Sequence, residues 1–88
     1  MRLKNKIVVI TGAANGQGAS EAKLLASEGA TIIVADIREK LGLSVVSEVN
    51  QMSGVAEYVQ LDVRDEKNWQ EIISRTVNKY ERIDILIN

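Results

Sequence analysis

Four residue types are missing from this sequence: cysteine, histidine, proline and phenylalanine. Without cysteine, the chain can form no disulfide, thiolate metal site or cysteine nucleophile. Without histidine, it has neither an imidazole general base nor a histidine ligand for zinc. We therefore expect no metal site, and no proline interrupts a helix or strand.

A charge excess of one sign and long apolar runs are also missing. Eleven basic residues stand against twelve acidic ones, giving a formal net charge of −1 with no long cluster of like charges. This balance predicts no nucleic-acid partner and no membrane surface. The 45% hydrophobic and 26% charged content is typical of one small globular domain. Residues 1–6 are followed by only four strongly apolar residues before Thr11, too few for a signal-peptide core, so we expect a cytoplasmic protein.

Six glycines are present, and three of them lie in the segment TGAANGQG at residues 11–18, directly after the apolar run 7–10. Gly12 lets the chain leave a strand through φ angles that a Cβ disfavours. Gly16 lets the backbone approach a pyrophosphate, and Gly18 lets the next helix pack close to the sheet. The first amides of that helix can bind an anion without a basic side chain. The alternative is a strand-to-helix turn that binds nothing.

The next apolar run, residues 31–35, ends at Asp36, which lies 18 residues after Gly18. An acidic residue at about this distance, at the carboxyl end of the second strand, is where a dinucleotide-binding fold places its ribose-binding carboxylate. The order of strand, glycines, helix, strand and acid therefore favours a dinucleotide site over a turn without a ligand.

The spacing of apolar residues predicts three helices. The first is expected over about residues 16–28, with Gly29 placed for a left-handed cap, and the second over about 39–52. The buried stripe of the second should be Leu41, Val45, Val49 and Met52. The third has the clearest pattern, with one packed face made of Trp69, Ile72, Ile73, Thr76, Val77 and Tyr80. At this spacing its two aromatic residues are interpreted as core rather than as a ligand platform.

The strands predict a parallel sheet. Residues 7–10, 32–35 and 85–87 are continuously apolar, as expected where helices cover both faces, whereas residues 55–61 alternate as at an edge. Right-handed crossovers then favour the strand order 3-2-1-4, with the first two helices on one face and the third on the other. The predicted fold class is α/β, the first half of a three-layer Rossmann-type parallel sheet.

Four features now occur together: the glycine pattern, Asp36, the pair Asp62-Val63 after the third strand, and the ending DILIN at residues 84–88. They closely resemble the amino-terminal part of a short-chain dehydrogenase/reductase, over the whole chain. The glycine spacing is similar to that of the compact oxidoreductases of this family rather than the extended sugar epimerases. The resemblance implies a nicotinamide cofactor and hydride transfer between an alcohol and a carbonyl.

The resemblance also implies roles for individual residues around the pyrophosphate. The turn itself would be formed by Gly12, Gly16 and Gly18. Asn15 and Gln17 would supply polar contacts beside it.

On the adenosine side, Asp36 would accept hydrogen bonds from the ribose hydroxyls, and Ile37 would pack against the adenine. Asp62 would bind the adenine amino group, and the Val63 amide would contact a ring nitrogen. A turn residue capping the loop into the third helix is an open alternative for Asp62. Asn88 resembles the first residue of the asparagine-rich turn after the fourth strand.

No catalytic residue is expected within the chain. The family's active site combines a serine with a tyrosine followed four residues later by a lysine, but here Tyr58 is followed by Asp62 and Tyr80 by Asp84. Residues 1–88 are thus expected to be the amino-terminal part of a single NAD(P)-binding domain, inactive alone. The parent protein would be a homo-oligomeric enzyme acting on a small-molecule alcohol or carbonyl. A dinucleotide-binding module without catalysis, or a fragment that binds nothing, are the alternatives.

NAD is expected in preference to NADP, because Asp36 would repel the 2′-phosphate of NADP and residues 13–15 offer no basic side chain. Arg38 argues the other way, and is interpreted as a solvated residue at the start of the second helix.

Overall fold

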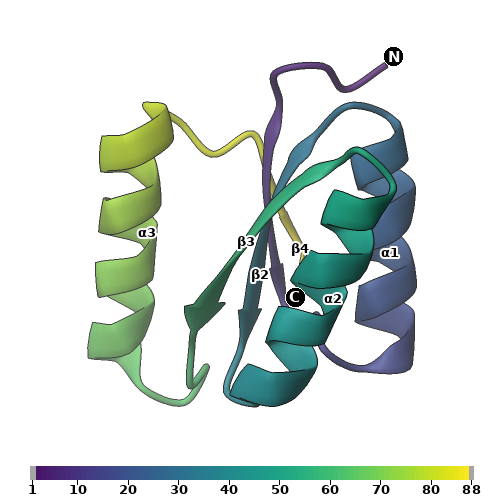
Figure 1. Cartoon of the computed structure of the whole chain (residues 1–88). Coiled ribbons are helices and arrows are strands. Elements are labelled where there is room, and N and C mark those ends of the chain that lie inside the picture. Colours follow the sequence, from purple (N-terminus) through teal and green to yellow (C-terminus); the bar gives the residue numbers. More distant parts are fainter. Residues whose placement is uncertain (1, 88) are drawn as a thin grey trace.

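The computed structural model describes residues 2–87. Strands and helices alternate strictly along them (Figure 1). The elements are β1 (Ile7–Thr11), α1 (Gly16–Ser27), β2 (Thr31–Asp36), α2 (Glu39–Gln51), β3 (Val55–Gln60), α3 (Glu66–Tyr80) and β4 (Ile85–Ile87).

The strands form one parallel sheet in the order β3-β2-β1-β4, which confirms the predicted order. Ile33 of β2 lies opposite both Val9 of β1 and Glu57 of β3, and Val9 also lies opposite Leu86 of β4. Figure 1 shows α1 and α2 on one face of the sheet and α3 alone on the other, as expected for right-handed crossovers.

Two apolar cores result, one on each face, because alternate residues of a strand point to opposite sides. The core under α1 and α2 contains Val8, Ile10, Ile32, Val34, Ala22, Ala26, Val45 and Val49. The core under α3 contains Ile7, Val9, Ile33, Ala35, Val59, Leu61 and Ile72. Full burial of an aliphatic side chain contributes about 1.5–3 kcal/mol, so the central strands β1 and β2 supply much of the stabilisation.

The helix ends follow local sequence signals. Gly29, which follows the C-cap residue Glu28 of α1, has a φ of 97°, which confirms the predicted left-handed cap. The helix α3 begins at Glu66, before the clearest part of its apolar pattern, because the Asp65 side chain accepts a hydrogen bond from the Asn68 amide at 3.2 Å.

The buried stripe of α2 differs from the prediction at both ends. Leu41 and Met52 are 48% and 43% exposed, and Gly42 is buried together with Val45 and Val49. Met52 is the C-cap residue, beyond the last turn of α2. At the other end the reason is Tyr58 of β3, whose ring lies where a Cβ on Gly42 would be. An aromatic side chain from the strand therefore fills the space that the helix's own side chains were expected to fill.

The packed face of α3 is largely as predicted. Ile72 and Thr76 are buried, and Trp69 and Tyr80 pack against the core, which confirms their structural role. Val77 is an exception, at 40% exposure. The apolar part of this surface continues past the helix, where a hollow of about 500 Å³ is lined by Trp69, Gln70, Ile73, Ser74 and Leu86.

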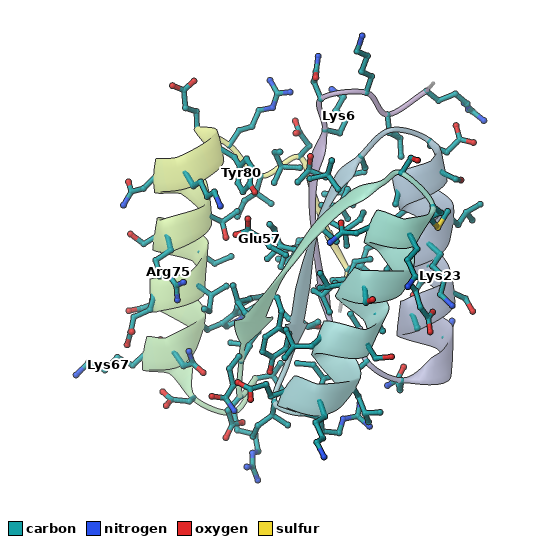
Figure 2. All side chains as sticks on the ribbon, viewed as in Figure 1. Lys6, Lys23, Glu57, Lys67, Arg75 and Tyr80 are labelled. Atoms are coloured by element: carbon teal, nitrogen blue, oxygen red, sulfur yellow. The ribbon has the colours of Figure 1, made fainter. Side chains whose placement is uncertain are left out.

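A polar contact also joins α3 to the edge strand β3. Tyr80 Oη and Lys79 Nζ donate to Glu57 Oε2 at 2.6 and 2.7 Å, and Figure 2 shows Tyr80 and Glu57 directed toward one another. Partial burial opposes ionisation of Glu57, but the hydrogen bonds from Lys79 and Tyr80 outweigh it and lower its pKa. The lone helix on this face is thus held by charge as well as by apolar packing.

Candidate functional site

The loop between β1 and α1 has the geometry that its glycines predict. Gly12 has a φ of 64°, in the left-handed region that favours glycine. The Asn15 side chain caps α1, and its Oδ1 accepts a hydrogen bond from the Gly18 amide at 3.2 Å. Asn15 thus satisfies the Gly18 amide. The amides of Gly16 and Gln17 have no intrahelical acceptors, because they belong to the first turn, and they lie at the positive end of the helix.

Gly16 and Gly18 have different surroundings. A Cβ on Gly18 would lie 2.6 Å from the Gly12 carbonyl oxygen and 2.8 Å from the Ala13 Cα, so glycine is required for α1 to pack against the loop. A Cβ on Gly16 would meet nothing within 4 Å. The fold therefore needs Gly18, and Gly16 leaves open space over the helix amides.

A hollow of about 380 Å³ lies at this end of α1. It is lined by Thr11, Gly12, Asn15, Gln17, Gly18, Glu21, Val63 and Ile87. Five of these were predicted for the pyrophosphate or adenine contacts: Gly12, Asn15, Gln17, Gly18 and Val63. The structure thus brings the loop of β1 and the loop after β3 to one edge of the sheet.

Asp36 is the last residue of β2 and is only 4% exposed. Its Oδ2 accepts a hydrogen bond from the Ala14 amide at 3.1 Å, which joins the carboxylate to the glycine loop. Its Oδ1 accepts from the Arg38 amide at 2.8 Å, and the Arg38 side chain donates to both oxygens from Nε and Nη2 at 3.0 Å. Burial opposes ionisation, but these four hydrogen bonds and the Arg38 charge hold the pKa of Asp36 below its ordinary value.

Arg38 is therefore ion-paired rather than free in solvent. It lies at the start of α2, as predicted, and its side chain is 47% exposed. The contact with Asp36 in turn raises the pKa of Arg38.

Asp62, after β3, repeats this arrangement. Its Oδ1 accepts from the amide and Nε of Arg64 at 3.0 Å each, and its Oδ2 accepts from Nη2 at 3.1 Å. The Arg64 hydrogen bonds lower the pKa of Asp62. Asp62 is thus a turn residue, as one of its two interpretations held, but the cap of α3 is Asp65.

These two aspartates face a common hollow of about 260 Å³. It is lined by Gly12, Asp36, Ile37, Arg38, Leu61, Asp62, Val63 and Arg64. All four residues predicted for the adenosine side are among them, with Ile37 and Val63 50% and 59% exposed. Gly12 and Val63 also line the hollow beside the glycine loop, so the two spaces adjoin. Asn88, the remaining predicted contact, lies outside the described residues.

Sequence reasoning missed one residue that positions the site. Tyr58 Oη donates to the main-chain carbonyl oxygen of Asp36 at 2.6 Å, while its ring packs on Gly42. Burial, with the nearby carboxylates of Glu39 and Asp36, raises the pKa of Tyr58. The only indication of this role in the sequence was that Tyr58 lies in the segment 55–61, where apolar and polar residues alternate as in an edge strand.

Among residues 2–87, no helix has both the length and the apolar character to span a bilayer. The same residues contain no group of three or more acidic side chains arranged to hold a metal ion.

The fold and the site together define a Rossmann-like, dinucleotide-binding class of protein. The family model for short chain dehydrogenases matches residues 6–88. The chain belongs to the short-chain dehydrogenase/reductase family.

Three known proteins illustrate the similarity. Cyclopentanol dehydrogenase of Comamonas sp. (strain NCIMB 9872) is 37% identical over 99% of this chain and 35% of its own length. The 3-oxoacyl-(acyl-carrier-protein) reductase FabG of Thermotoga maritima is 41% identical over all of this chain and 36% of its own length. A metagenomic short-chain oxidoreductase solved with NADP has a TM-score of 0.95 at 26% identity, over 98% of this chain and 39% of that one. The chain therefore spans about a third of the length of the relatives it matches.

Proposed function

We propose that this chain is the cofactor-binding segment of an oxidoreductase that interconverts an alcohol and a carbonyl and prefers NAD to NADP. The observation that carries the proposal is the position of Asp36, a buried carboxylate hydrogen-bonded to the glycine loop where two hollows adjoin. A carboxylate there can accept hydrogen bonds from ribose hydroxyls, each charge-assisted contact contributing about 1.5–3 kcal/mol.

The residues present fit the other parts of a dinucleotide. Open space at Gly16 and the amides of Gly16 and Gln17 suit a pyrophosphate, since a helix amino terminus favours an anion. Ile37 and Val63 offer apolar contacts to an adenine, and Asp62 and the Val63 amide offer an acceptor and a donor. The nicotinamide of such a cofactor supplies or accepts the hydride.

The preference for NAD follows from charge. Asp36 is held ionised, and a carboxylate facing the 2′-phosphate of NADP would repel it. Isothermal titration of NAD⁺ and NADP⁺ into the protein as its gene encodes it tests this. We expect NAD⁺ to bind roughly 10-fold more tightly or better, corresponding to about 1.4 kcal/mol. Asp36→Ala should narrow the difference. Equal or tighter binding of NADP⁺ by the unaltered protein would refute the preference.

Residues 1–88 are proposed to be the amino-terminal part of a single domain whose catalytic residues come from elsewhere in the protein. The partial coverage of the relatives supports this. A tyrosine and a lysine four residues apart in the rest of the protein, with turnover lost on substituting the tyrosine, would distinguish the enzyme from a non-catalytic binding module. Cytoplasmic location and homo-oligomeric assembly stay predictions, which cell fractionation and sedimentation of the whole protein can test.

A further inference from the structure

The carboxylate of Asp36 is already fully used within the chain. A carboxylate offers about four acceptor positions, two on each oxygen. Here Oδ1 accepts from the Arg38 amide and Arg38 Nε, and Oδ2 accepts from the Ala14 amide and Arg38 Nη2. Two hydroxyls of a ribose can therefore bind only if two of these four donors leave.

The two backbone donors and the two side-chain donors differ in how easily they leave. The Ala14 and Arg38 amides are fixed by the loops that carry them. The Arg38 guanidinium belongs to a side chain that is 47% exposed, whereas the Asp36 side chain that it contacts is 3% exposed. The cation can therefore leave for solvent by side-chain rotation, and the buried carboxylate then needs other donors in its place. The planar guanidinium donates two parallel N–H groups, one to each oxygen of Asp36. The two hydroxyls of a ribose would bring the same number of donors.

We propose that Arg38 is an internal occupant of the ribose acceptor. This inference rests on the proposed function. Without cofactor, the guanidinium fills both acceptor positions of Asp36 that a ribose would need. When the adenosine ribose binds, the guanidinium moves away, while the Ala14 and Arg38 amides keep the carboxylate oriented. Arg38 then lies at the rim of the same hollow, where a cation favours a 2′-phosphate. Arg38 therefore weakens NAD binding and supports NADP binding.

The pair Asp62 and Arg64 provides an internal control. It has the same spacing in sequence, nearly the same distances, and lines the same hollow. Among the described residues, however, Asp62 accepts hydrogen bonds only from Arg64, three in number, so one of its four acceptor positions stays open to an adenine amino group. Removing Arg64 therefore takes one positive charge from the same hollow, as removing Arg38 does. It frees no acceptor position that the nucleotide needs.

The experiment compares Arg38→Met, Arg38→Lys and Arg64→Met with the unaltered protein, each as the whole gene product. Titration with NAD⁺ and with NADP⁺ gives two affinities per variant. We expect Arg38→Met to bind NAD⁺ at least about fivefold more tightly and NADP⁺ about fivefold or more weakly, since fivefold is about the upper value for a fully exposed ion pair and Asp36 is buried. Arg38→Lys should also gain NAD⁺ affinity, to a smaller extent, and keep NADP⁺ affinity. Arg64→Met should change both affinities by a similar factor.

Thermal unfolding separates this role from a merely structural one. Arg38→Met should lower the unfolding temperature without nucleotide, because Asp36 loses its partner, and saturating NAD⁺ should restore it. If NAD⁺ affinity is unchanged or falls in both Arg38 variants, or if Arg64→Met shifts the NAD⁺ to NADP⁺ ratio as strongly as Arg38→Met, the proposal is wrong. If the unaltered protein binds neither nucleotide, the proposed function itself fails, and this inference fails with it.

Discussion

Valine at Gly16 and valine at Gly18 are expected to have opposite consequences, although the two residues share one loop. A Cβ on Gly18 would lie 2.6 and 2.8 Å from main-chain atoms of Gly12 and Ala13. Main-chain atoms cannot rotate away as a side chain can, so α1 must move off the loop. Overpacking of this kind costs about 1–3 kcal/mol, and we expect the upper end for a branched side chain. In a domain of 150–250 residues this lowers the unfolding temperature by roughly 6–12 °C.

A Cβ on Gly16 would meet no neighbouring atom within 4 Å, so for valine at this position the free energy of unfolding should change by no more than about 0.5 kcal/mol. The same side chain would fill the space through which a pyrophosphate reaches the Gly16 and Gln17 amides. Loss of two hydrogen bonds to a charged group, about 1.5 kcal/mol each, predicts roughly a 100-fold loss of NAD⁺ affinity or more.

Calorimetric unfolding and NAD⁺ titration on both variants test the argument, with Gly16→Ala as the matched, smaller change. Gly16→Val should unfold like the unaltered protein and fail to bind, whereas Gly18→Val should lose stability first. Unchanged NAD⁺ affinity in Gly16→Val would mean that the loop is only a turn. A Gly18→Val protein as stable as the original would contradict the close approach on which the packing argument depends.

Three further predictions concern the supports of the site. Tyr58→Phe removes the hydrogen bond to the Asp36 carbonyl oxygen and should cost about 1 kcal/mol in chemical denaturation, with a several-fold weaker NAD⁺ affinity; an unchanged affinity would show that Tyr58 does not position the turn. Because the folded chain lowers the pKa of Asp36 from its ordinary value of 3.8, Asp36 stabilises the fold above that pH, and the contribution disappears as the pH falls through the folded-state pKa. Acid titration of Asp36→Asn should therefore show a shallower loss of stability than the unaltered protein, and identical curves would count against this. A polypeptide of residues 1–88 alone should associate in sedimentation, because β4 is an edge strand and Trp69, Ile73 and Leu86 line an open apolar hollow; a monodisperse monomer with strongly protected amides in β4 would contradict it.

Sequence periodicity was sufficient to predict the sheet, because the apolar pattern of each strand indicates whether one or both of its faces are buried. Continuous apolar runs in β1 and β2 can be satisfied only by helices on both faces, and parallel crossovers then allow few strand orders. Periodicity was insufficient for α2, where the stripe depends on Tyr58 from another element. A helix pattern records which side chains are apolar, but it does not record that an aromatic ring from β3 occupies the space beside Gly42.

The candidate site shows the same division. The positions of the glycines, Asp36 and Asp62 could be predicted, because each lies at or just after the end of a strand or in the first turn of a helix. The hydrogen-bond partners of the two aspartates were not predicted, because each contact depends on how the chain folds back within two residues. The sequence did contain a usable signal: the pattern aspartate, aliphatic residue, arginine occurs at residues 36–38 and again at 62–64. An aspartate that accepts from the amide two residues later brings the side chain at that position back over its own carboxylate.

This repetition follows from what the carboxyl edge of a parallel sheet requires. The chain leaves β2 and β3 there, and a side-chain carboxylate that accepts a main-chain amide stabilises each exit. The same carboxylates are acceptors that face the space between the loops. The hydrogen bonds that stabilise the two turns thus place carboxylates at this edge of the sheet even without a ligand. The arginines then determine how many acceptor positions of those carboxylates stay free. Asp36 has all four acceptor positions filled, and Asp62 has three filled by described residues. Two turns with similar local sequences are therefore expected to respond differently to one ligand, because only the turn at Asp36 must give up internal hydrogen bonds to bind it.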